Sequence, residues 1–502
     1  MSQLKGQGID PKIDRLVMVS NRLPIVPTKG KEGKWQVQPG SGGLVTALAP
    51  ILRDRGGLWI GWPGTLEETD LDKLMAMGSK SIGYTLKPVM LTAEEIDRYY
   101  FGFSNEILWP LFHSLHLRCN FDPAYWSTYR AVNRKFAQVI AENARANDYI
   151  WVHDYHLMLV AEELRAIGVE CKVGFFLHTP FPPRDIFAIL PWRSQIIEAL
   201  AEYDLVGFQT MRDRNNLVGY VESLIKGLHV DGRRQVCRIA MPQRESRVGA
   251  FPIGIDFKEF ARQAANETVL ERVRQLREAI GDRQIILGVD RLDYSKGIPE
   301  RLRAFGNALE RFDDLHGKVT LVQIAVPSRE DIHQYQALKA EIEGLVGEIN
   351  GKFSQSGWIP IHYMFRSLER AELLAYYRAA DIALVTPLKD GMNLIAKEYC
   401  AASIDNNGVL VLSEFAGAAT QLGRGALVVN PYDIEGVADA IYQAYCMSTS
   451  ERQSRMRKLR ESVAKRDIFW WVDFFIWAAV THNLDDWWLS RRRRVPGNGR
   501  LV

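Results

Sequence analysis

The chain of 502 residues is longer than one hydrophobic core usually organises, so we expect two domains of about half the chain each. Its composition, 47% hydrophobic and 25% charged, is typical of a soluble globular protein and excludes a disordered or fibrous chain. The 63 Lys and Arg residues nearly balance the 60 Asp and Glu residues, and a net charge of +3 argues against nucleic acid or an anionic membrane as a partner. Any anion must therefore be bound by a local group of cations.

The cysteines and the apolar segments favour a reducing cytoplasm. None of the five cysteines forms a CxxC pair, so neither a zinc ribbon nor a redox pair is expected. The segment 1–22 lacks the basic start and long apolar stretch of a secretion signal. The most apolar segment, 468–480, is too short to span a bilayer and contains Asp473, so we expect a buried or domain-bridging helix there and no membrane partner.

Short runs rich in Val, Ile and Leu recur along the chain between stretches with helical periodicity. In chain order they are RLVMVSN (15–21), DYIWVHD (148–154), KVGFFLH (172–178), DLVGFQ (204–209), QIILGVD (284–290), VTLVQIAV (319–326), DIALVTP (381–387), GVLVLSE (408–414) and ALVVNP (426–431). Such runs are typical of strands buried on both faces, and helices between them are typical of parallel βαβ units. The helical pattern is clearest at 267–280 and 301–315. We therefore predict an α/β protein.

The alternation is interrupted at AFPIGID (250–256), where a proline and two nearby glycines follow a charged, turn-rich stretch. We place a domain boundary there, with an N-terminal domain at 1–251 and a C-terminal domain at 252–465. Two doubly wound parallel-sheet domains of the Rossmann type, facing one another across a cleft, would bind a ligand at the carboxyl ends of both sheets.

Polar residues follow nearly every predicted strand, at the end where open parallel sheets bind their ligands. In the first half these residues are Arg22, His153, Asp154, His156 and His178. In the second half they are Arg291, Lys296, Arg329, Asp390 and Glu414. Chance would scatter such residues over both strand ends, so we expect them to mark the ligand site.

A glycine-rich segment, PGSGGLVTAL (39–48), opens a helical pattern soon after the first predicted strand. Gly42 and Gly43 would let backbone amides approach a phosphate at a helix N-terminus, although a plain helix start is the commoner meaning of such a turn. The segment lacks the GxGxxG spacing of a nicotinamide dinucleotide site. Arg291 can contact a phosphate with two N–H groups at once, and Lys296 offers it a compact positive charge. Alternatively, both are solvated loop charges. We expect them to hold a diphosphate together with the Gly42 helix end.

The segment TPLKDGMNLIAKEY places Asp390 directly before a predicted helix. The first free amides of that helix would belong to Gly391, Met392 and Asn393. A row of amides beside a carboxylate can grip sugar hydroxyls, although an ordinary Asp N-cap explains the pattern too. Glu398, about two turns further on, would accept both hydroxyls of a ribose, or is a surface helix residue. Asp390 and Glu398 thus bracket a polyhydroxylated ligand.

No metal site is expected. The sequence VHDYH (152–156) lacks a third ligand segment with a convincing spacing, which argues against zinc. The DxD pattern Asp70-Leu71-Asp72 lies in an acidic stretch that is typical of a solvated loop. We expect cations of the protein itself to neutralise the leaving group.

Ten motifs, in a fixed order, carry a resemblance to a known family. They are VSNRLP, SGGL, GGLWIGW, YYFGFSNEILWPLFH, WVHDYHL, FFLHTPFP, DRLDYSKG, VPSRED, TPLKDGMNLIAKEY and LSEFAGAA. Together they closely resemble the trehalose-6-phosphate synthases, which are retaining glycosyltransferases of family 20, and the likeness covers nearly all of residues 14–480. Motifs of this length and order are far more specific than any local pattern above.

The resemblance implies the GT-B arrangement of two Rossmann-like domains, with the acceptor held mainly by the N-terminal half and the sugar nucleotide mainly by the C-terminal half. It implies that a final helix at about 466–490 crosses back onto the first domain. The implied reaction moves glucose from UDP-glucose to glucose 6-phosphate with retention, giving alpha,alpha-trehalose 6-phosphate and UDP without a required metal or other cofactor.

The family's functional residues carry over by motif. The residues implied for the acceptor are Arg22, Tyr100, Trp109, Asp154 and Arg329, with Trp62 beside them. Those implied for the donor are Gly42, Gly43, Arg291, Lys296, Asp390, Gly391, Met392, Asn393, Leu394 and Glu398. His178 matches the active-site histidine beside the transferred glucose, and the implied catalytic residues are His178, Asp154, Arg291, Lys296 and Asp390. Lys389 stands where many bacterial members have arginine, and Leu368 where many have phenylalanine, which leaves the base contacts open.

We find no convincing pair of carboxylates at the strand ends to act as nucleophile and acid. We therefore favour a same-face transfer in which the leaving phosphate helps to deprotonate the acceptor hydroxyl. Three alternatives stay open: a glucosylglycerol-phosphate synthase that uses glycerol 3-phosphate, a noncatalytic sugar-phosphate sensor on the same fold, and a phosphorylase that carries pyridoxal phosphate. We also expect a homo-oligomer and a separate phosphatase for the product, while the nucleotide base stays open.

Overall fold

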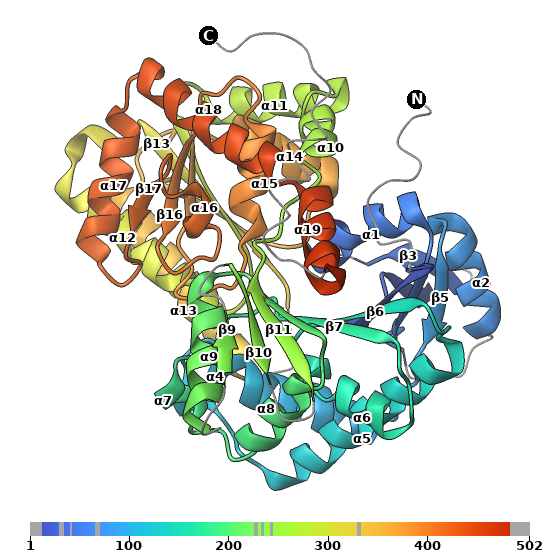
Figure 1. The fold of residues 1–502 in the computed structure, drawn as a ribbon. Coiled ribbons are helices and arrows are strands. Elements are labelled where there is room, and N and C mark those ends of the chain that lie inside the picture. The colour runs from blue at the N-terminus through green and yellow to red at the C-terminus, as the bar shows by residue number, and fades with distance from the viewer. Residues whose placement is uncertain are drawn as a thin grey trace, which may run out of the picture. The chain divides into compact units, whose positions relative to one another are not determined.

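The computed structural model describes residues 13–29, 35–40, 43–65, 71–224, 229–231, 235–240, 244–328 and 333–481. This part of the chain divides into two compact α/β units (Figure 1). The first unit ends at Phe251 and resumes at Phe469, and the second runs from Pro252 to Ile468. The chain therefore passes twice between the units, and the second unit is an insertion within the first.

A sheet of nine described strands forms the first unit. In spatial order they are β5 (Thr85–Pro88), β4 (Leu58–Trp62), β1 (Arg15–Arg22), β6 (Asp148–His153), β7 (Lys172–Phe176), β8 (Leu205–Phe208), β11 (Glu245–Ala250), β10 (Val236–Ala240) and β9 (His229–Asp231). Pairing is parallel from β5 to β11 and antiparallel from β11 to β9. A separate antiparallel pair joins β2 (Ile25–Lys29) to β3 (Trp35–Pro39). From β5 to β8 the strand order is that of the Rossmann fold, with its reversal between β1 and β6.

The second unit contains a fully parallel sheet of six described strands. In spatial order they are β14 (Ile361–Phe365), β13 (Val319–Val326), β12 (Gln284–Arg291), β15 (Ile382–Val385), β16 (Val409–Ser413) and β17 (Leu427–Val429). This is again the Rossmann order, with the reversal between β12 and β15. The nine predicted strands are confirmed in the two sheets, and the predicted α/β class is confirmed with them.

Six strands of the two main sheets were not predicted: β4, β5, β9, β10, β11 and β14. Strand β14 lies at the sheet edge and is partly exposed, so its sequence IHYMF lacks the apolar run that identifies a central strand. Strand β11 is partly exposed among its first residues, and its sequence ESRVGA likewise lacks a continuous apolar run.

The helices of the first unit lie around its sheet (Figure 1). They are α1 (Gly43–Arg55), α2 (Leu71–Ile82), α3 (Ala93–Glu95), α4 (Trp109–Phe112), α5 (Pro123–Asn143), α6 (Val160–Ala166), α7 (Arg184–Phe187), α8 (Arg193–Ala201) and α9 (Met211–Leu224), with the 3-10 turns η2 (His116–Arg118) and η3 (Tyr155–Leu157). A π-helix, η1 (Ile96–Leu108), joins α3 to α4. Thr92 and Glu95 begin this helical stretch with a capping box, since each side chain accepts the backbone N–H of the other.

The helices of the second unit alternate with its strands. They are α10 (Phe257–Ala264), α11 (Glu267–Ile280), α12 (Ile298–Arg311), α13 (His333–Phe353), α14 (Arg370–Ala379), α15 (Leu394–Ala402), α16 (Ala419–Leu422), α17 (Ile434–Cys446) and α18 (Thr449–Lys465), with the 3-10 turns η4 (Tyr294–Lys296) and η5 (Asp313–Leu315). The prediction at 267–280 matches α11. The prediction at 301–315 was displaced, because Gly297 at φ 63° and Pro299 begin α12 earlier.

The last described helix, α19 (Ile468–Val480), belongs to the first unit from Phe469 onward. Its Phe475 ring stacks on Trp151 of β6, with centroids 4.3 Å apart and planes at 7°. Its Trp471 Nε1 donates to the carbonyl oxygen of Phe251 at 2.9 Å. Gly207 in β8 leaves room for this helix, since a Cβ there would lie 2.6 Å from a Phe475 ring carbon. The segment 468–480 is therefore part of the core.

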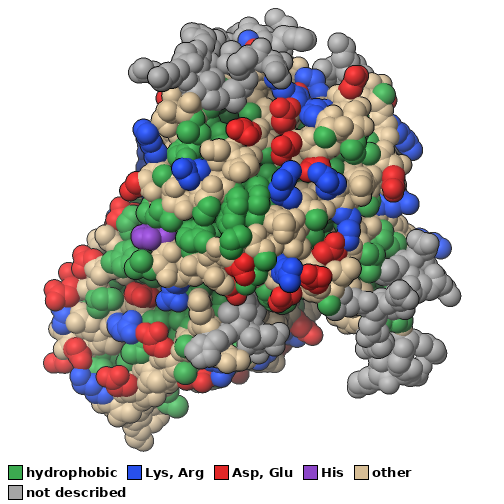
Figure 2. Space-filling model, turned by 90° about the horizontal axis from the view of Figure 1, so that it is seen from below, with side chains coloured by type: hydrophobic (Ala, Val, Ile, Leu, Met, Phe, Trp, Pro, Cys, Tyr) green, Lys and Arg blue, Asp and Glu red, His purple; other side chains and the backbone are tan. Residues whose placement is uncertain are grey.

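The face of the molecule in Figure 2 carries interspersed Lys, Arg, Asp and Glu side chains with hydrophobic ones between them. This mixture agrees with the near-neutral net charge of +3. Within the described ranges, no helix is both long and apolar enough to cross a membrane.

Candidate functional site

The predicted ligand residues lie at the topological switch point of each sheet. In the first unit the strand order reverses between β1, which ends at Arg22, and β6, which is followed by Asp154. In the second unit it reverses between β12 and β15, which are followed by Lys296 and Asp390. Neighbouring strands that lead to helices on opposite faces leave a crevice at their carboxyl ends, which is where such sheets bind ligands.

An exposed arginine at the end of β1 is held against aromatic rings. The guanidinium carbon of Arg22 lies 4.0 Å from the ring centroid of Trp62 and 5.8 Å from that of Tyr100. These rings meet edge to face, with centroids 6.0 Å apart. Gly64 passes under the same guanidinium at φ 87°, and a Cβ there would lie 1.7 Å from an Arg22 terminal nitrogen. The aromatic rings and the glycine fix the position of a guanidinium, a group whose fork of N–H donors suits an anion such as phosphate.

The π-helix η1 presents Tyr100 to this site and leads to Trp109. Long π-helical stretches are rare and often mark functional sites. The Tyr100 ring stacks on His156, with centroids 6.0 Å apart and planes at 13°. Trp109 is buried and packs against Tyr155 at 5.8 Å. The predicted residues Arg22, Tyr100 and Trp109 therefore lie in one network of rings that continues through the segment after β6.

Asp154 has an unusual backbone conformation, with φ 73° and ψ 167°. Few residues other than glycine adopt this region, and such strain costs about 1–3 kcal/mol. The conformation is held by the Asp154 N–H, which donates to Phe176 O at 2.8 Å, and by its Oδ1, which accepts the His178 N–H at 3.3 Å. A half-buried carboxylate held at the switch point in this way suits hydroxyl recognition.

The His178 side chain is buried in a hydrogen-bonded chain. Its Nε2 lies 3.1 Å from Nδ1 of His153, and its Nδ1 lies 3.2 Å from Nε2 of Gln209. Burial lowers the pKa of His178 to about 3. Burial and the neighbouring His178 also lower the pKa of His153 well below its usual range. Both rings are therefore neutral at physiological pH, and the predicted catalytic histidine is no proton carrier there.

In the second unit, Lys296 and Asp390 form a buried ion pair. Nζ of Lys296 lies 2.6 Å from Oδ2 of Asp390, and both side chains are 11% exposed. Oδ1 of Asp390 accepts the backbone N–H groups of Met392 at 3.0 Å and Asn393 at 3.2 Å. Gly417 allows this loop to pack closely, because a Cβ there would lie 1.8 Å from the carbonyl oxygen of Gly391.

The prediction that Gly391, Met392 and Asn393 carry the first free amides of a helix after Asp390 was wrong. Helix α15 begins at Leu394, and Asn393 is its N-cap, accepting the Ala396 N–H at 3.1 Å. Asn393 has φ 58°, a left-handed conformation that asparagine tolerates. Asp390 instead accepts two amides of its own loop. The carboxylate and the loop therefore form one preorganised unit.

Glu398 lies in α15 and is half-buried. The hydroxyl of Tyr377 donates to its Oε2 at 2.9 Å. Burial raises the pKa of Glu398, and this hydrogen bond acts against the rise. Sequence reasoning missed Tyr377, because a tyrosine within α14 shows no feature that separates it from a core residue. It also missed Gln209, although this polar residue ends the predicted run DLVGFQ and directly follows β8, which was an available signal.

Of the four other predicted residues, two lie at the ends of described elements and two do not lie in the described part of the chain. Arg291 ends β12 and is exposed. Gly43 is the first residue of α1. Gly42 and Arg329 lie outside the described residues. The structure therefore groups Arg22 with Tyr100, Asp154 with His178, and Lys296 with Asp390, Met392 and Asn393.

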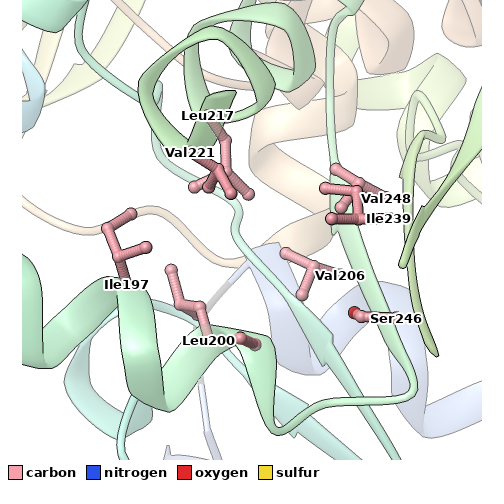
Figure 3. A pocket seen from close by; sticks show the side chains of 9 residues that line it. Ile197, Leu200, Val206, Leu217, Val221, Ile239, Ser246 and Val248 are labelled. Atoms are coloured by element: carbon pink, nitrogen blue, oxygen red, sulfur yellow. The ribbon is translucent and has the colours of Figure 1, made fainter. Parts of the chain in front are cut away.

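A small cavity of about 20 Å³ lies apart from these residues (Figure 3). It is lined by side chains of α8, α9, β8, β10 and β11, which include Leu200, Leu217 and Val248. It could hold at most about one water molecule and its walls are mainly apolar, so it is a packing defect and not a substrate site. Among the described residues, no group of three or more His, Cys, Asp or Glu side chains is placed to hold a metal ion.

Comparisons with known proteins agree with this geometry. A family model for glycosyltransferase family 20 matches residues 14–479. The trehalose-6-phosphate synthase of Mycolicibacterium vanbaalenii is 43% identical over 465 residues, which cover 92% of this chain and 94% of the relative. The crystal structure of a UDP-forming alpha,alpha-trehalose-phosphate synthase from Burkholderia xenovorans in complex with glucose-6-phosphate is 38% identical, with a TM-score of 0.84 over 93% of this chain and 100% of the other. An E. coli trehalose-6-phosphate protein bound with UDP-2-fluoro glucose is 38% identical, with a TM-score of 0.82 over 93% and 99% of the two chains.

Proposed function

Since the chain belongs to glycosyltransferase family 20, we propose that the switch point of its first unit binds the acceptor sugar phosphate and that of its second unit binds the sugar nucleotide. Each switch point offers the chemistry that its ligand needs. The first has a cation over aromatic rings and a fixed carboxylate, and the second has a buried lysine paired with a carboxylate that the amides of its own loop hold in place.

The chain is a retaining, UDP-forming alpha,alpha-trehalose-phosphate synthase on a GT-B fold. It transfers glucose from UDP-glucose to glucose 6-phosphate, giving alpha,alpha-trehalose 6-phosphate and UDP. The structures of its relatives include one in complex with glucose-6-phosphate and one bound with UDP-2-fluoro glucose.

In the acceptor site, Arg22 pairs with the phosphate of glucose 6-phosphate, because a guanidinium matches the geometry of phosphate oxygens. Tyr100 and Arg329 are the other phosphate ligands. Asp154 accepts acceptor hydroxyls, and Trp109 shapes the pocket through its packing on the ring network. The strained backbone of Asp154 supports its assignment, since strain persists where function requires a fixed side chain.

In the donor site, Arg291 and Lys296 stabilise the diphosphate, and Gly42 and Gly43 bring amides to it. Transfer builds negative charge on the departing phosphate, and fixed cations aimed at that charge lower the barrier. The pairing of Lys296 with Asp390 is the observation that carries the donor assignment, because it joins a cation for phosphate to a carboxylate for sugar at one switch point.

The remaining donor residues hold the two sugars. Asp390 and the loop Gly391–Leu394 hold the transferred glucose, and Glu398 accepts the ribose hydroxyls. His178 lies beside the glucose as a neutral, buried side chain, so it places the sugar and transfers no proton. The leaving phosphate oxygen takes the proton of the acceptor hydroxyl on the same face of the sugar. This step needs neither a protein nucleophile nor a bound metal.

The test is UDP release from UDP-glucose by protein treated with EDTA, with glucose 6-phosphate or glycerol 3-phosphate offered separately. We expect release only with glucose 6-phosphate, and full activity without metal. For the residue assignment, Arg22→Ala should raise the KM for glucose 6-phosphate by about a hundredfold, because it removes a charged phosphate contact. An unchanged KM would contradict the acceptor assignment, and a covalent glucosyl adduct on the protein would contradict the same-face mechanism.

A homo-oligomer and a cytoplasmic location complete the proposal. A net charge of +3 leaves little mutual repulsion to oppose self-association, and the five free cysteines fit a reducing compartment. Light scattering on the purified chain should give a mass of two or four copies. Fractionation of cells should recover the protein with cytoplasmic markers.

A further inference from the structure

Helix α15 carries a lysine that the proposed reaction does not use. Lys397 is 2% exposed, and lysines are almost never buried to this extent unless their nitrogen is paired. Its Nζ donates to the carbonyl oxygen of Ile253 at 2.5 Å and to Oε1 of Gln421 at 2.7 Å. Both acceptors are uncharged, so these two bonds are a specific polar anchor and not an ordinary ion pair.

Both bonds lead to the segments through which the chain passes between the two units. Ile253 lies two residues after Phe251, where the first unit ends. The amide nitrogen of Gln421 donates to the carbonyl oxygen of Ser462 at 2.9 Å, near the end of α18. Helix α18 leads directly to the return point after Ile468. One lysine therefore anchors α15 to the outgoing segment directly, and to the element before the returning segment through a glutamine.

The outgoing and returning segments are also bonded to each other. The backbone N–H of Ile468 donates to the carbonyl oxygen of Ile255 at 3.1 Å. A Cβ at Gly254 would lie 2.3 Å from the carbonyl carbon of Asp467, so only glycine permits this approach. The two segments thus form one tightly packed strap, which we define as residues 252–255 and 466–468.

The lowered pKa of Lys397 fits a buried anchor. Burial, with a smaller contribution from the positive charge of Arg466, lowers its pKa to about 7, and Cys400 acts against this shift. A neutral amine has two N–H groups, which is the number of acceptors that the structure provides here. The amine can therefore be satisfied in a buried position without a carboxylate partner.

We propose that Lys397 is a positioning residue of the donor site, which fastens the first turn of α15 to the strap. This turn carries the loop of Asp390 at its start and Glu398 beside the lysine, so a displacement of the turn would move both proposed sugar contacts together. The inference rests on the proposed assignment of Asp390 and Glu398 to the donor. It predicts that loss of the anchor impairs use of the donor and spares binding of the acceptor.

The test compares Lys397→Met, which keeps a long apolar side chain but removes both hydrogen bonds, with Tyr399→Phe in the same helix. The Tyr399 hydroxyl donates to the carbonyl oxygens of Ala380 and Asp381 at 3.3 Å, and neither lies in the strap. We expect Lys397→Met to lower kcat/KM for UDP-glucose about tenfold, with the KM for glucose 6-phosphate changed less than about twofold. Tyr399→Phe should lower the melting temperature and leave both constants unchanged.

Three results would overturn the inference. Lys397→Met would be a merely structural change if it lowered the melting temperature but left kcat/KM for UDP-glucose unchanged. If Lys397→Met does not fold, Gln421→Leu removes one of the two acceptors and should show a smaller loss of kcat/KM that is confined to UDP-glucose. An equal loss for both substrates would refute the anchor.

Asp390→Asn and Glu398→Gln distinguish a failure of the donor assignment from a failure of the anchor. If they leave donor kinetics unchanged, the donor assignment fails with the inference; if they impair donor use while Lys397→Met does not, the anchor alone fails.

Discussion

Nε2 of His178 lies 3.1 Å from Nδ1 of His153, and the side-chain amide nitrogen of Gln209 lies 3.2 Å from the other ring nitrogen of His178. An amide nitrogen donates, so Nδ1 of His178 accepts and its proton resides on Nε2, from which it is donated to His153. Both nitrogens of the His178 ring are thus used inside the protein. These two side-chain contacts hold the His178 residue in place. Its backbone N–H donates to Oδ1 of Asp154 at 3.3 Å, so the same residue also positions the Asp154 carboxylate.

We expect this histidine pair to make the protein less stable in mild acid. Burial keeps both rings neutral in the folded state, with the pKa of His178 at about 3, while an unfolded histidine titrates near 6.5. Between these values the unfolded chain binds more protons, so the free energy of unfolding rises with pH and falls as acid is added. Each histidine should contribute a slope of about 1.4 kcal/mol per pH unit below its unfolded pKa.

Urea denaturation at pH 7.0 and 5.5 measures this slope, a range of about 1.5 units that stays above most carboxylate titrations. The double variant His153→Gln/His178→Gln is the control, since it removes both titrating rings. An equal pH dependence in wild type and double variant would show that the rings are protonated in the folded state.

Gly64 should be required for acceptor binding, because it lies under Arg22. Gly64→Ala places a methyl group where an Arg22 terminal nitrogen now lies, 1.7 Å from the ideal Cβ position. The guanidinium must then move off Trp62, and we expect the KM for glucose 6-phosphate to rise about tenfold while donor binding is unchanged. Initial rates at varied acceptor concentration provide the measurement.

Gly168→Ala is the matched control for that change. Gly168 has φ 83°, close to the 87° of Gly64, but a Cβ there meets nothing within 4 Å. It therefore carries the same backbone cost of about 1 kcal/mol without any collision. If both variants changed the acceptor KM equally, the effect would come from backbone strain and not from Arg22.

Replacing Lys296 and Asp390 together should cost less stability than the sum of the two single replacements, but it should not restore activity. Both side chains are 11% exposed, so removing one partner leaves a buried charge without its counterion. We expect Lys296→Met or Asp390→Asn alone to lower the free energy of unfolding by about 3 kcal/mol. The double variant should regain part of that loss, because no uncompensated charge remains.

Activity separates the two roles of this pair. All three variants should lose at least about a hundredfold in kcat, since the leaving phosphate loses a fixed cation or the glucose loses its carboxylate. Chemical denaturation and initial rates on the same preparations give both quantities. Additive stability losses in the double variant would contradict the pairing, and a single variant with wild-type kcat would contradict the donor assignment.

Tyr377 should set the pH range of donor binding through Glu398. The hydrogen bond from Tyr377 lowers the pKa of Glu398, which burial raises. In Tyr377→Phe this pKa rises further, so less of the carboxylate is ionised in mild acid and able to accept two ribose hydroxyls. We expect the KM for UDP-glucose to rise about fivefold near pH 6 and less near pH 8.

Tyr376→Phe is the neighbouring control, because the Tyr376 hydroxyl contacts the sulfur of Met364 at 3.6 Å and not Glu398. This variant should keep the wild-type KM at both pH values. The same rise at both pH values in Tyr377→Phe would show a lost contact without an effect on ionisation.

The sequence alone predicted those features that each depend on a single segment of the chain, such as a buried strand. Strands such as β12 and β13 are buried on both faces along nearly their whole length and consist mainly of apolar residues. They are therefore visible in the sequence as apolar runs, and the placement of the residues after them follows from sheet geometry. Hydrogen-bond partners distant in the chain were not visible. Gln209 meets His178 across 31 residues, and Tyr377 meets Glu398 across 21, so only the folded arrangement brings them together.

The start of α15 shows a second limit. Asp390 and Asn393 are both good N-cap residues, three positions apart, and local propensity cannot choose between them. In the folded chain Asp390 is engaged by Lys296 and by its own loop, so the cap falls to Asn393. The sequence identified both residues of the motif but assigned the cap to the wrong one.

The position of α19 has a consequence for how the chain is made. Trp471 reaches Phe251 across 220 residues, and Phe475 completes the core beside Trp151 and Gly207. A ribosome releases the whole inserted unit before it releases these two aromatic side chains. The first unit therefore begins synthesis first but is completed last. Until α19 is released, the apolar sheet face that this helix covers stays exposed, and a chaperone could bind that face.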